Sequence, residues 1–563
     1  MEPLGMAASG DVALEKAEWQ DILFQAVPDR LALAKLKPKW PCREMVVHVH
    51  RNHAFEPLVL AGQAYFRYAD LAPRFLYGGY DDSFTFDWAK GHPADLELIW
   101  IDARRYAEAG ADFSLGEWFR ARLVALRAQS AAPILVVAIP PAPAVREPLA
   151  LAAHGLAGVH VAELGELAQQ LGERFNDLRA ARYTGTCLGD LALILLAREM
   201  ACRWIPAVLG PRVKAIAVDL DHTLYDGVLG EERGGVHLTA GHVELHRQLL
   251  HCRKNGLLLA LVSRNEEIDV RGLFRLRRDF PLRWADFSAT AIGWGDKAEG
   301  VRAIARDLNI GMDAILFVDD NPGELALVAA RVPGVRTLHA KADPRGTLAG
   351  LAHAPGVWRW ERSETDALRA ADLAAERERK RQQLAVADPE AYLRSLHVHL
   401  QVDVRPRPHL KRLQELSQKT NQFNLAMRRL TEAELERYFL DPDGRVASIR
   451  LSDRLSDSGV VGIVAGRRRG NDLFLEEIAI SCRALGRGLE DVMLAAATQA
   501  LVRGWECSRV MIAHRTGPRN APARNWLMRL TGEPLEAEGQ VDAGSALGRI
   551  DMAQYPVRVE ICN

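Results

Sequence analysis

The chain has 563 residues, of which 48% are hydrophobic, so it is long enough for about three or four domains with ordinary cores. Its 72 Lys and Arg residues nearly balance its 73 Asp and Glu residues, and this excludes a global basic surface for nucleic acid. The seven cysteines form no Cys-x-x-Cys pair, and the sequence has neither a signal-peptide pattern nor an apolar run that could span a bilayer. We therefore expect a reduced, soluble, cytoplasmic protein with no nucleic-acid and no membrane partner.

Residues 1–210 are predicted to form an α/β domain, because strand-like apolar runs alternate with amphipathic helical stretches. That alternation is typical of a parallel sheet with crossover helices. The predicted strands cover 45–50, 96–101 and 134–139, and the predicted helices include 115–129 and 161–178.

Three histidines, His48, His50 and His53, lie on or just after the first predicted strand. Their spacing resembles that of metal ligands, but no acidic residue or Cys follows at a matching spacing. We expect ordinary strand-end and loop histidines here.

Residues 211–350 are predicted to form a second α/β domain, which opens with an apolar run that ends in Asp219 and Asp221. Two carboxylates at alternate positions leave a strand on the same side. One can then attack an electrophile while the other gives and takes protons. Taken alone, Asp-x-Asp favours a metal site or a capped loop without turnover over a catalytic pair.

Three further segments of this domain deliver polar groups at a strand end or a helix start. The strand 257–262 ends in Ser263-Arg264-Asn265, Lys297 opens a helix, and the strand 314–318 ends in Asp319-Asp320. The order is therefore carboxylates, hydroxyl, lysine and carboxylates. Parallel strands bring such ends to one edge of the sheet, where α/β proteins bind ligands.

This ordered set resembles the haloacid dehalogenase (HAD) superfamily of phosphotransferases. The resemblance implies that Asp219 is the nucleophile and Asp221 the general acid and base, with Lys297 and Ser263 on the phosphoryl group. It also implies a Mg²⁺ cofactor bound by oxygen ligands. The implied phosphate-binding residues are Thr223, Ser263, Arg264, Asn265 and Lys297, and the implied metal ligands are Asp219, Asp221 (through its backbone carbonyl), Asp319 and Asp320.

Residues 351–395 are dense in Ala, Arg and Glu, which favours a solvated helical linker; a basic patch facing phosphate or a carrier is the alternative. Residues 396–563 then form a third predicted domain. Its strands are expected at 397–404, 447–451, 459–464 and 473–480, with helices from His409 and over 491–502.

The third domain carries Arg483-x-x-Gly486-Arg487-Gly488 between a predicted strand and a helix. This pattern, together with Asn520, resembles the turn by which GNAT acyltransferases hold the pyrophosphate of coenzyme A on backbone N–H groups. Cys482 precedes the turn. A position beside Arg483, Arg487 and a helix amino terminus would favour its thiolate, and a buried structural Cys is the alternative.

Together these stretches resemble the FkbH-like family, in which a HAD domain is fused to a GNAT-like domain. The matching motifs include Asp-Leu-Asp-x-Thr-Leu, Val-Ser-Arg-Asn, Phe-Val-Asp-Asp-Asn-Pro, Lys-Thr-Asn-Gln-Phe-Asn-Leu and Ser-Cys-Arg-Ala-Leu-Gly-Arg-Gly. The fold that follows is multidomain α/β, with a Rossmann-like HAD core between an α/β domain that loosely resembles SGNH hydrolases and a GNAT-like α+β domain. No nucleophilic Ser follows the first strand, so we expect no hydrolase activity from the first domain.

The resemblance implies a glyceryl transferase and phosphatase of natural-product (polyketide) biosynthesis. Such an enzyme takes glyceryl from 1,3-bisphosphoglycerate, removes the remaining phosphate and loads glyceryl on the phosphopantetheine thiol of an acyl carrier protein. Cys482 would carry the thioester, and the carrier arm would contact Arg483, Gly486, Arg487, Gly488 and Asn520.

This chain departs from the family pattern at His222 and at Tyr225-Asp226-Gly227, where Asn and Trp-Gly-Gly are usual. These changes leave a related three-carbon acyl phosphate open as the substrate. Two other functions remain open: a plain phosphatase with a vestigial acyltransferase domain, and a non-catalytic scaffold that docks a carrier protein.

Overall fold

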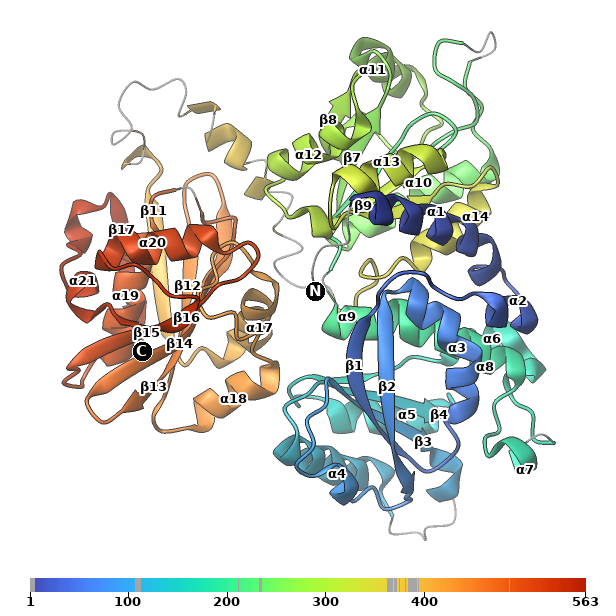
Figure 1. The fold of residues 1–563 in the computed structure, drawn as a ribbon, viewed down its shortest axis with the longest axis horizontal. Helices are drawn as coiled ribbons and strands as arrows, with labels where there is room; N and C mark the ends of the chain where they lie inside the picture. The colour runs from blue at the N-terminus through green and yellow to red at the C-terminus, as the bar shows by residue number, and fades with distance from the viewer. Residues whose placement is uncertain are drawn as a thin grey trace. The chain divides into compact units, whose positions relative to one another are not determined.

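The computed structural model describes residues 6–106, 113–179, 181–210, 212–231, 235–361, 368, 372–373, 375–379, 381–382, 392, 394–485 and 487–562. The chain divides into two compact units, Met1–Arg362 and Ser363–Asn563. The first unit holds two parallel sheets, and the second holds one largely antiparallel sheet (Figure 1). No helix among the described residues combines the length and the apolar character needed to cross a membrane.

The first sheet of the first unit has the order β2-β1-β3-β4-β5, and all its strands are parallel. Its central strands β3 and β4 are wholly buried, because helices cover both faces. The strands are β1 Arg43–Arg51, β2 Leu71–Tyr80, β3 Leu96–Asp102, β4 Ile134–Ile139 and β5 Val159–Val161. The helices are α2 Arg30–Lys35, α3 Glu56–Tyr68, α4 Leu115–Gln129, α5 Pro143–Ala153, α6 Gly165–Leu171, α7 Ala181–Thr184, α8 Asp190–Glu199 and α9 Ile205–Leu209.

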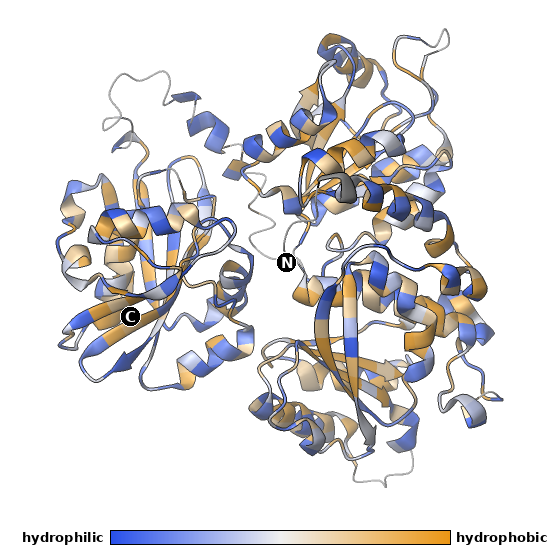
Figure 2. Ribbon diagram, in the orientation of Figure 1, coloured by the Kyte–Doolittle hydropathy of each residue, from blue (hydrophilic) through white to orange (hydrophobic). Residues whose placement is uncertain are grey.

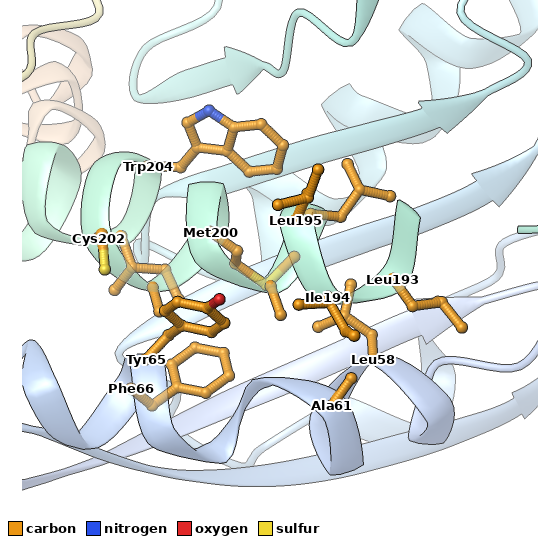
Figure 3. Close-up of a cluster of buried hydrophobic side chains, with 14 of the residues drawn as sticks. Leu58, Ala61, Tyr65, Phe66, Leu193, Ile194, Leu195, Met200, Cys202 and Trp204 are labelled. Carbon is orange, nitrogen blue, oxygen red and sulfur yellow. The ribbon is translucent and has the colours of Figure 1, made fainter. Parts of the chain in front are cut away.

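Helices α3 and α8 pack closely over one face of this sheet. Leu58, Tyr65 and Phe66 of α3 meet the apolar run around Leu193–Leu195 and Met200 (Figure 3). Gly62 permits the approach, because a Cβ there would lie 2.5 Å from the Cβ of Ala197. Burial of these large side chains is the main stabilising term of the domain.

The second sheet has the order β10-β9-β6-β7-β8, again all parallel. Figure 2 shows hydrophobic residues concentrated along the strands and hydrophilic ones on the outer faces of the helices. The strands are β6 Ala215–Val218, β7 Leu258–Ser263, β8 Phe287–Ile292, β9 Ile315–Asp319 and β10 Arg336–His339. The helices are α10 Ala240–Lys254, α11 Glu267–Leu276, α12 Lys297–Asp307, α13 Pro322–Arg331 and α14 Pro344–Ala352.

The first helix, α1 (Met6–Leu23), packs against α13 of the second sheet's domain. A Cβ on Gly10 would lie 3.0 Å from the carbonyl oxygen of Ala326, so the two helices touch closely. His339 N donates to Gln20 Oε1 at 3.1 Å, and Lys341 Nζ donates to the carbonyl of Ala17 at 3.0 Å. Helix α1 also packs on the first domain, because Trp19 and Leu23 belong to that domain's core and Gln20 Nε2 donates to the Tyr68 hydroxyl at 3.2 Å. It therefore contacts both domains of the first unit.

The second unit contains a seven-stranded sheet of order β16-β15-β14-β13-β12-β11-β17. Neighbours from β11 to β14 are antiparallel, whereas β14 and β15 are parallel. The strands are β11 Val398–Val404, β12 Gly444–Ser452, β13 Asp457–Arg469, β14 Asp472–Ile480, β15 Arg509–Arg515, β16 Glu538–Asp542 and β17 Val557–Cys562. The helices are α17 Leu410–Lys419, α18 Glu432–Leu440, α19 Glu490–Val502, α20 Ala521–Thr531 and α21 Gly544–Gly548.

The predicted multidomain α/β class with a Rossmann-like core is confirmed by these sheets. The helix predicted over 161–178 is confirmed in part, as α6 covers Gly165–Leu171 and a 3-10 turn follows at Gly172–Phe175. Its bounds were wrong, because β5 ends at Val161 and Gly172, at φ 54, ends α6. Much of the predicted linker 351–395 lies outside the described residues. Within it, Asp372 and Arg379 are 4% and 5% exposed in the second unit, so the prediction of a solvated helix was wrong at these positions.

Candidate active site

The two acidic motifs of the first unit meet at the centre of the second sheet. Asp219 directly follows β6, and Asp319 is the last residue of its neighbour β9. The chain runs from β6 to β7 on one side and returns to β9 on the other, so the strand order reverses between β6 and β9. This reversal is where doubly wound sheets bind ligands, at the carboxyl ends of their strands.

Lys297, the first residue of α12, joins the two carboxylates. Its Nζ lies 2.9 Å from Asp219 Oδ1 and 2.6 Å from Asp319 Oδ2. All three side chains are at least 90% buried, so their charges are weakly screened. Burial and the negative charge of Asp319 raise the pKa of Asp219 to about 7, although Lys297 opposes this shift. Burial alone would lower the pKa of Lys297, but the two carboxylates raise it, so the ammonium stays charged.

Asp320 adds a third carboxylate to this group. Oxygen atoms of Asp219, Asp319 and Asp320 all lie within 4.8 Å of one another. When all three carboxylates are ionised, they exceed the single ammonium by two negative charges at a largely buried point. An all-oxygen donor set with this charge fits Mg²⁺, which Asp219, Asp319 and Asp320 would hold.

The side chain of Asp221 does not belong to that acidic group, and its carboxylate accepts three hydrogen bonds. Its Oδ1 accepts from the Tyr225 hydroxyl at 2.5 Å and from Leu229 N at 2.9 Å, and its Oδ2 accepts from Asn265 Nδ2 at 2.7 Å. These three hydrogen bonds hold the Asp221 carboxylate in one orientation. A metal contact through its backbone carbonyl stays a prediction.

The departures from the family pattern fall into two kinds in the structure. Tyr225 is fully buried, and burial and the charge of Asp221 raise the pKa of its phenol, so it remains a donor. His222, at φ 53, and Asp226 are instead exposed, with His222 Nδ1 3.5 Å from Asp226 Oδ1. Tyr225 therefore acts on a site residue, whereas His222 and Asp226 lie at the surface.

The predicted phosphate-binding residues are placed differently from one another. Ser263 ends β7 and is 2% exposed, and its Oγ accepts from Asn265 Nδ2 at 3.0 Å. Thr223 is 3% exposed, and its Oγ1 has no hydrogen-bond partner among the described residues. Arg264 turns to Glu324, 2.7 Å away, so its guanidinium is held by that ion pair.

In the second unit, Cys482 begins a turn after β14, and α19 starts only at Glu490. The turn and the helix start are close to where the sequence predicts them, and the place of Cys482 beside the helix amino terminus stays a prediction. The cysteine is partly exposed. Gly488, at φ 68, has the left-handed backbone that the motif suggests, and Gly486 lies outside the described residues.

The arginines after Cys482 belong to a buried charge cluster. Arg487 Nη1 lies 3.2 Å from Asp453 Oδ2, and Arg483 Nη1 lies 3.4 Å from Asp372 Oδ2. Arg379 also contacts Asp453, at 2.8 Å. Arg379 Nη1 also lies 3.3 Å from Glu376 Oε2, so three guanidinium groups face three carboxylates and the cluster has no formal charge excess.

The predicted pantetheine contact of Asn520 is not available, because this side chain is fully buried and its amide binds the chain itself. Its Nδ2 donates to the carbonyls of Asn424 and Arg515, at 2.9 and 2.8 Å. The segment 423–425 runs between β14 and β15, whose direct pairing ends at Leu475 and Ile512. Ile480 N donates to Phe423 O at 2.9 Å, and Arg515 N donates to Leu425 O at 2.8 Å.

The sequence analysis did not predict the contacts of three polar residues with candidate site residues. Tyr225 contacts Asp221, Asp372 joins the cluster near Cys482, and Glu97 on β3 meets His48 and His50 on β1. The expectation that no acidic residue accompanies these histidines was wrong, whereas His53 lies apart, beside Thr186. The signal in the sequence was the position of Glu97, a single acidic residue inside the apolar run Leu96–Ile101 of a strand that is buried on both faces.

No protein-family model and no curated protein matches the chain. Among solved structures, it is similar to the N-terminal part of a Bacteroides fragilis protein containing a phosphatase domain complexed with Mg. That similarity has 18% identity over 59% of this chain and 97% of the other, with a TM-score of 0.45. A cobalt-bound deoxy-D-mannose-octulosonate 8-phosphate phosphatase from Haemophilus influenzae has 18% identity over 25% of this chain and 90% of its own, with a TM-score of 0.19.

A HAD family enzyme from Bacteroides thetaiotaomicron, in complex with magnesium and inorganic phosphate, has 16% identity over 23% of this chain and 95% of its own, with a TM-score of 0.18. These identities and TM-scores do not assign the chain to a family. The function is therefore inferred from the residues of the site.

Proposed function

We propose that the carboxylate group at the ends of β6 and β9 is a magnesium-dependent phosphoryl-transfer site of the kind that the HAD resemblance implies. The observation that carries the proposal is the bridge from Lys297 to Asp219 and Asp319, with Asp320 beside it. Bound Mg²⁺ would supply the positive charge that a phosphate ester needs next to three carboxylates.

In this proposal, Asp219 is the nucleophile, because Lys297 fixes its carboxylate at the strand end. An Asp219 oxygen bonds to phosphorus, the bond to the leaving oxygen breaks, and protonated Asp221 gives that oxygen its proton. Asp221 then takes a proton from water, which cleaves the aspartyl phosphate to inorganic phosphate. Tyr225 and Asn265 keep Asp221 in place during both steps.

The finer part of the proposal is acyl transfer. As the FkbH-like resemblance implies, Cys482 would attack the acyl phosphate of 1,3-bisphosphoglycerate, forming a thioester and releasing inorganic phosphate. The phosphopantetheine thiol of an acyl carrier protein would then attack the thioester and free Cys482. The support for this step is the sequence pattern around Cys482 together with the partial exposure of that cysteine.

A plain phosphatase with a vestigial acyltransferase domain is the second candidate. The position of residues 423–425 favours it, because these residues take up the backbone groups of β14 and β15 that a pantetheine arm could use. In that case Cys482 has no role in turnover.

The test is to incubate the full chain with 1,3-bisphosphoglycerate, Mg²⁺ and a holo carrier protein, and to weigh both proteins and assay phosphate. We expect a glyceryl mass on both proteins. With Cys482→Ala we expect no mass on either and unchanged hydrolysis of a simple phosphate ester, while Cys507→Ala, also partly exposed, should behave as wild type. Phosphate release without an acyl group on either protein would support the plain phosphatase. Carrier binding without phosphate release would support the non-catalytic scaffold.

A further inference from the structure

Two histidines and a glutamate meet on one face of the first sheet, away from the site at Asp219. His48 and His50 occupy alternate positions of β1, so both side chains leave the same face, and Glu97 lies opposite His48 on β3. The three residues are 0%, 2% and 1% exposed. A carboxylate and two imidazoles this deeply buried need partners, because an unpaired polar group in a protein interior is costly.

The partners present in the chain do not satisfy them. His50 Nε2 lies 2.8 Å from Glu97 Oε2, whereas His48 Nδ1 lies 3.3 Å from the same oxygen, outside hydrogen-bond geometry. Among the described residues, neither nitrogen of His48 has a hydrogen-bond partner, and His50 Nδ1 has none either. The Glu97 carboxylate is therefore the shared neighbour of both imidazole rings. Buried imidazole nitrogen atoms are left that a ligand such as a metal ion could contact.

The segment between β2 and β3 covers this cluster with aromatic rings. The centroid of the Trp88 ring lies 5.1 Å from that of the His48 ring and 5.2 Å from that of the His50 ring. The centroid of the Phe86 ring lies 4.7 Å from that of the His50 ring. Trp88 packs on Gly78, where a Cβ would lie 2.3 Å from its Nε1.

The backbone of this cover is strained. Phe84 and Phe86 have φ values of 48° and 64°, which side chains of this size rarely adopt. Asp81 holds the segment by accepting from Ser83 N at 2.8 Å and Thr85 N at 2.9 Å. Such strain persists where the surrounding structure enforces it, and it concentrates at ligand sites.

We propose that His48 Nδ1, His50 Nε2 and Glu97 bind a divalent transition cation of the zinc type. The three ligand groups offer one donor atom each, all within 4.8 Å of one another. Tetrahedral zinc with bonds of about 2.0 to 2.1 Å separates its ligand atoms by about 3.3 Å. The distance from His48 to Glu97 already has this value, and the distance from His50 to Glu97 must widen by about half an ångström.

Nitrogen donors distinguish this site from the all-oxygen group at Asp219, which suits magnesium. The cation would tie β1 to β3 under the aromatic cover, while a small ligand completes its coordination. It would therefore stabilise the first sheet in proportion to its binding.

The experiment titrates the full, chelator-treated protein with Zn²⁺ and with Co²⁺, following thermal unfolding, bound metal by native mass spectrometry, and the visible absorption of tetrahedral Co²⁺. We expect one tight equivalent and a rise of the unfolding temperature with Zn²⁺. His50→Gln and Glu97→Gln, which keep shape and hydrogen-bonding capacity, should each lose that equivalent.

Two control variants should retain the tight equivalent: His154→Gln at an exposed histidine, and Asp320→Asn in the magnesium-type group. Circular dichroism and Mg²⁺-dependent phosphate release show that the ligand variants are folded. The proposal is overturned if wild-type protein takes up no Zn²⁺, or if the tight equivalent survives in both His50→Gln and Glu97→Gln. Loss of the equivalent in Asp320→Asn instead would assign it to the other site and also overturn the proposal.

Discussion

The hydroxyl of Tyr225 donates to Asp221 Oδ1 at 2.5 Å, and the ring that carries it is fully buried. Tyr225 is one of the residues at which the sequence departs from the FkbH-like pattern. It ties the proposed general acid and base to the domain core, because Tyr225 packs near Phe280. In the proposed reaction, Tyr225 would therefore act through Asp221.

Tyr225→Phe is expected to lower the rate of phosphate release by roughly 10- to 150-fold, because a hydrogen bond to a charged group contributes roughly 1.5–3 kcal/mol. The KM should change little, since Tyr225 acts on Asp221 and not on substrate. Steady-state phosphate assays over a range of pH would show this, and Tyr183→Phe, at a tyrosine that is 92% exposed, is the control. An unchanged rate and pH profile would remove Tyr225 from the site.

Lys297→Met is expected to abolish phosphate release and to lower the free energy of unfolding by roughly 3–5 kcal/mol without metal, because it leaves buried carboxylates uncompensated. Mg²⁺ should restore part of the stability, since it neutralises the same oxygens, but not the activity. Urea titrations with and without Mg²⁺ measure both effects. The exposed Lys254→Met provides the control, and equal stability of the two variants would contradict the role of the bridge.

Two glycine substitutions are expected to shift stability in opposite directions. Gly62→Ala should cost about 1–3 kcal/mol, because the new methyl group would lie 2.5 Å from Ala197 Cβ between α3 and α8. Gly272→Ala in α11 meets no atom within 4 Å and should gain about 0.5–1 kcal/mol from helix propensity. Chemical unfolding of both variants tests the pair, and a stable Gly62→Ala protein would show that α3 and α8 can separate easily.

The stability of the second sheet's domain is expected to fall as the pH drops from about 6.5 to about 4. Burial lowers the pKa of His246 to about 4, against about 6.5 in an unfolded chain, so the unfolded state binds more protons in this window. The stabilisation is present above pH 6.5 and decreases by up to about 3 kcal/mol as the pH falls through the window.

His246→Gln keeps an amide that can donate to the Leu224 carbonyl, the partner of His246 Nε2 at 2.9 Å. The free energy of unfolding of this variant should depend less on pH between 7 and 4 than that of wild type. Parallel slopes for the two proteins would show that His246 does not titrate in that range.

The sequence predicted the strands that are buried on both faces, because runs such as 134–139 are apolar throughout. It also predicted the meeting of Asp219, Lys297 and Asp319, since each follows a strand or opens a helix at the same edge of a sheet. Strand β2 was missed because Pro73, Gly78 and Gly79 break the strand pattern, and an edge strand tolerates them.

Contacts between distant segments could not be predicted in the same way. The pairing of His48 with Glu97 depends on the register between β1 and β3, and the burial of Asn520 depends on the path of residues 423–425. Neither register nor path is encoded in local periodicity.

The packing of α1 on α13 has a consequence for biosynthesis. Gln20 and His339, which are joined by a hydrogen bond, are 319 positions apart, so at roughly 5–20 residues per second α1 leaves the ribosome about 15–60 s before that partner. Buried residues of α1 such as Ala13 and Ala17 stay without their final neighbours during that interval. A nascent chain halted near Gly210 should therefore be a chaperone substrate, and α1 supplied as a separate peptide should rescue a chain that begins at residue 24.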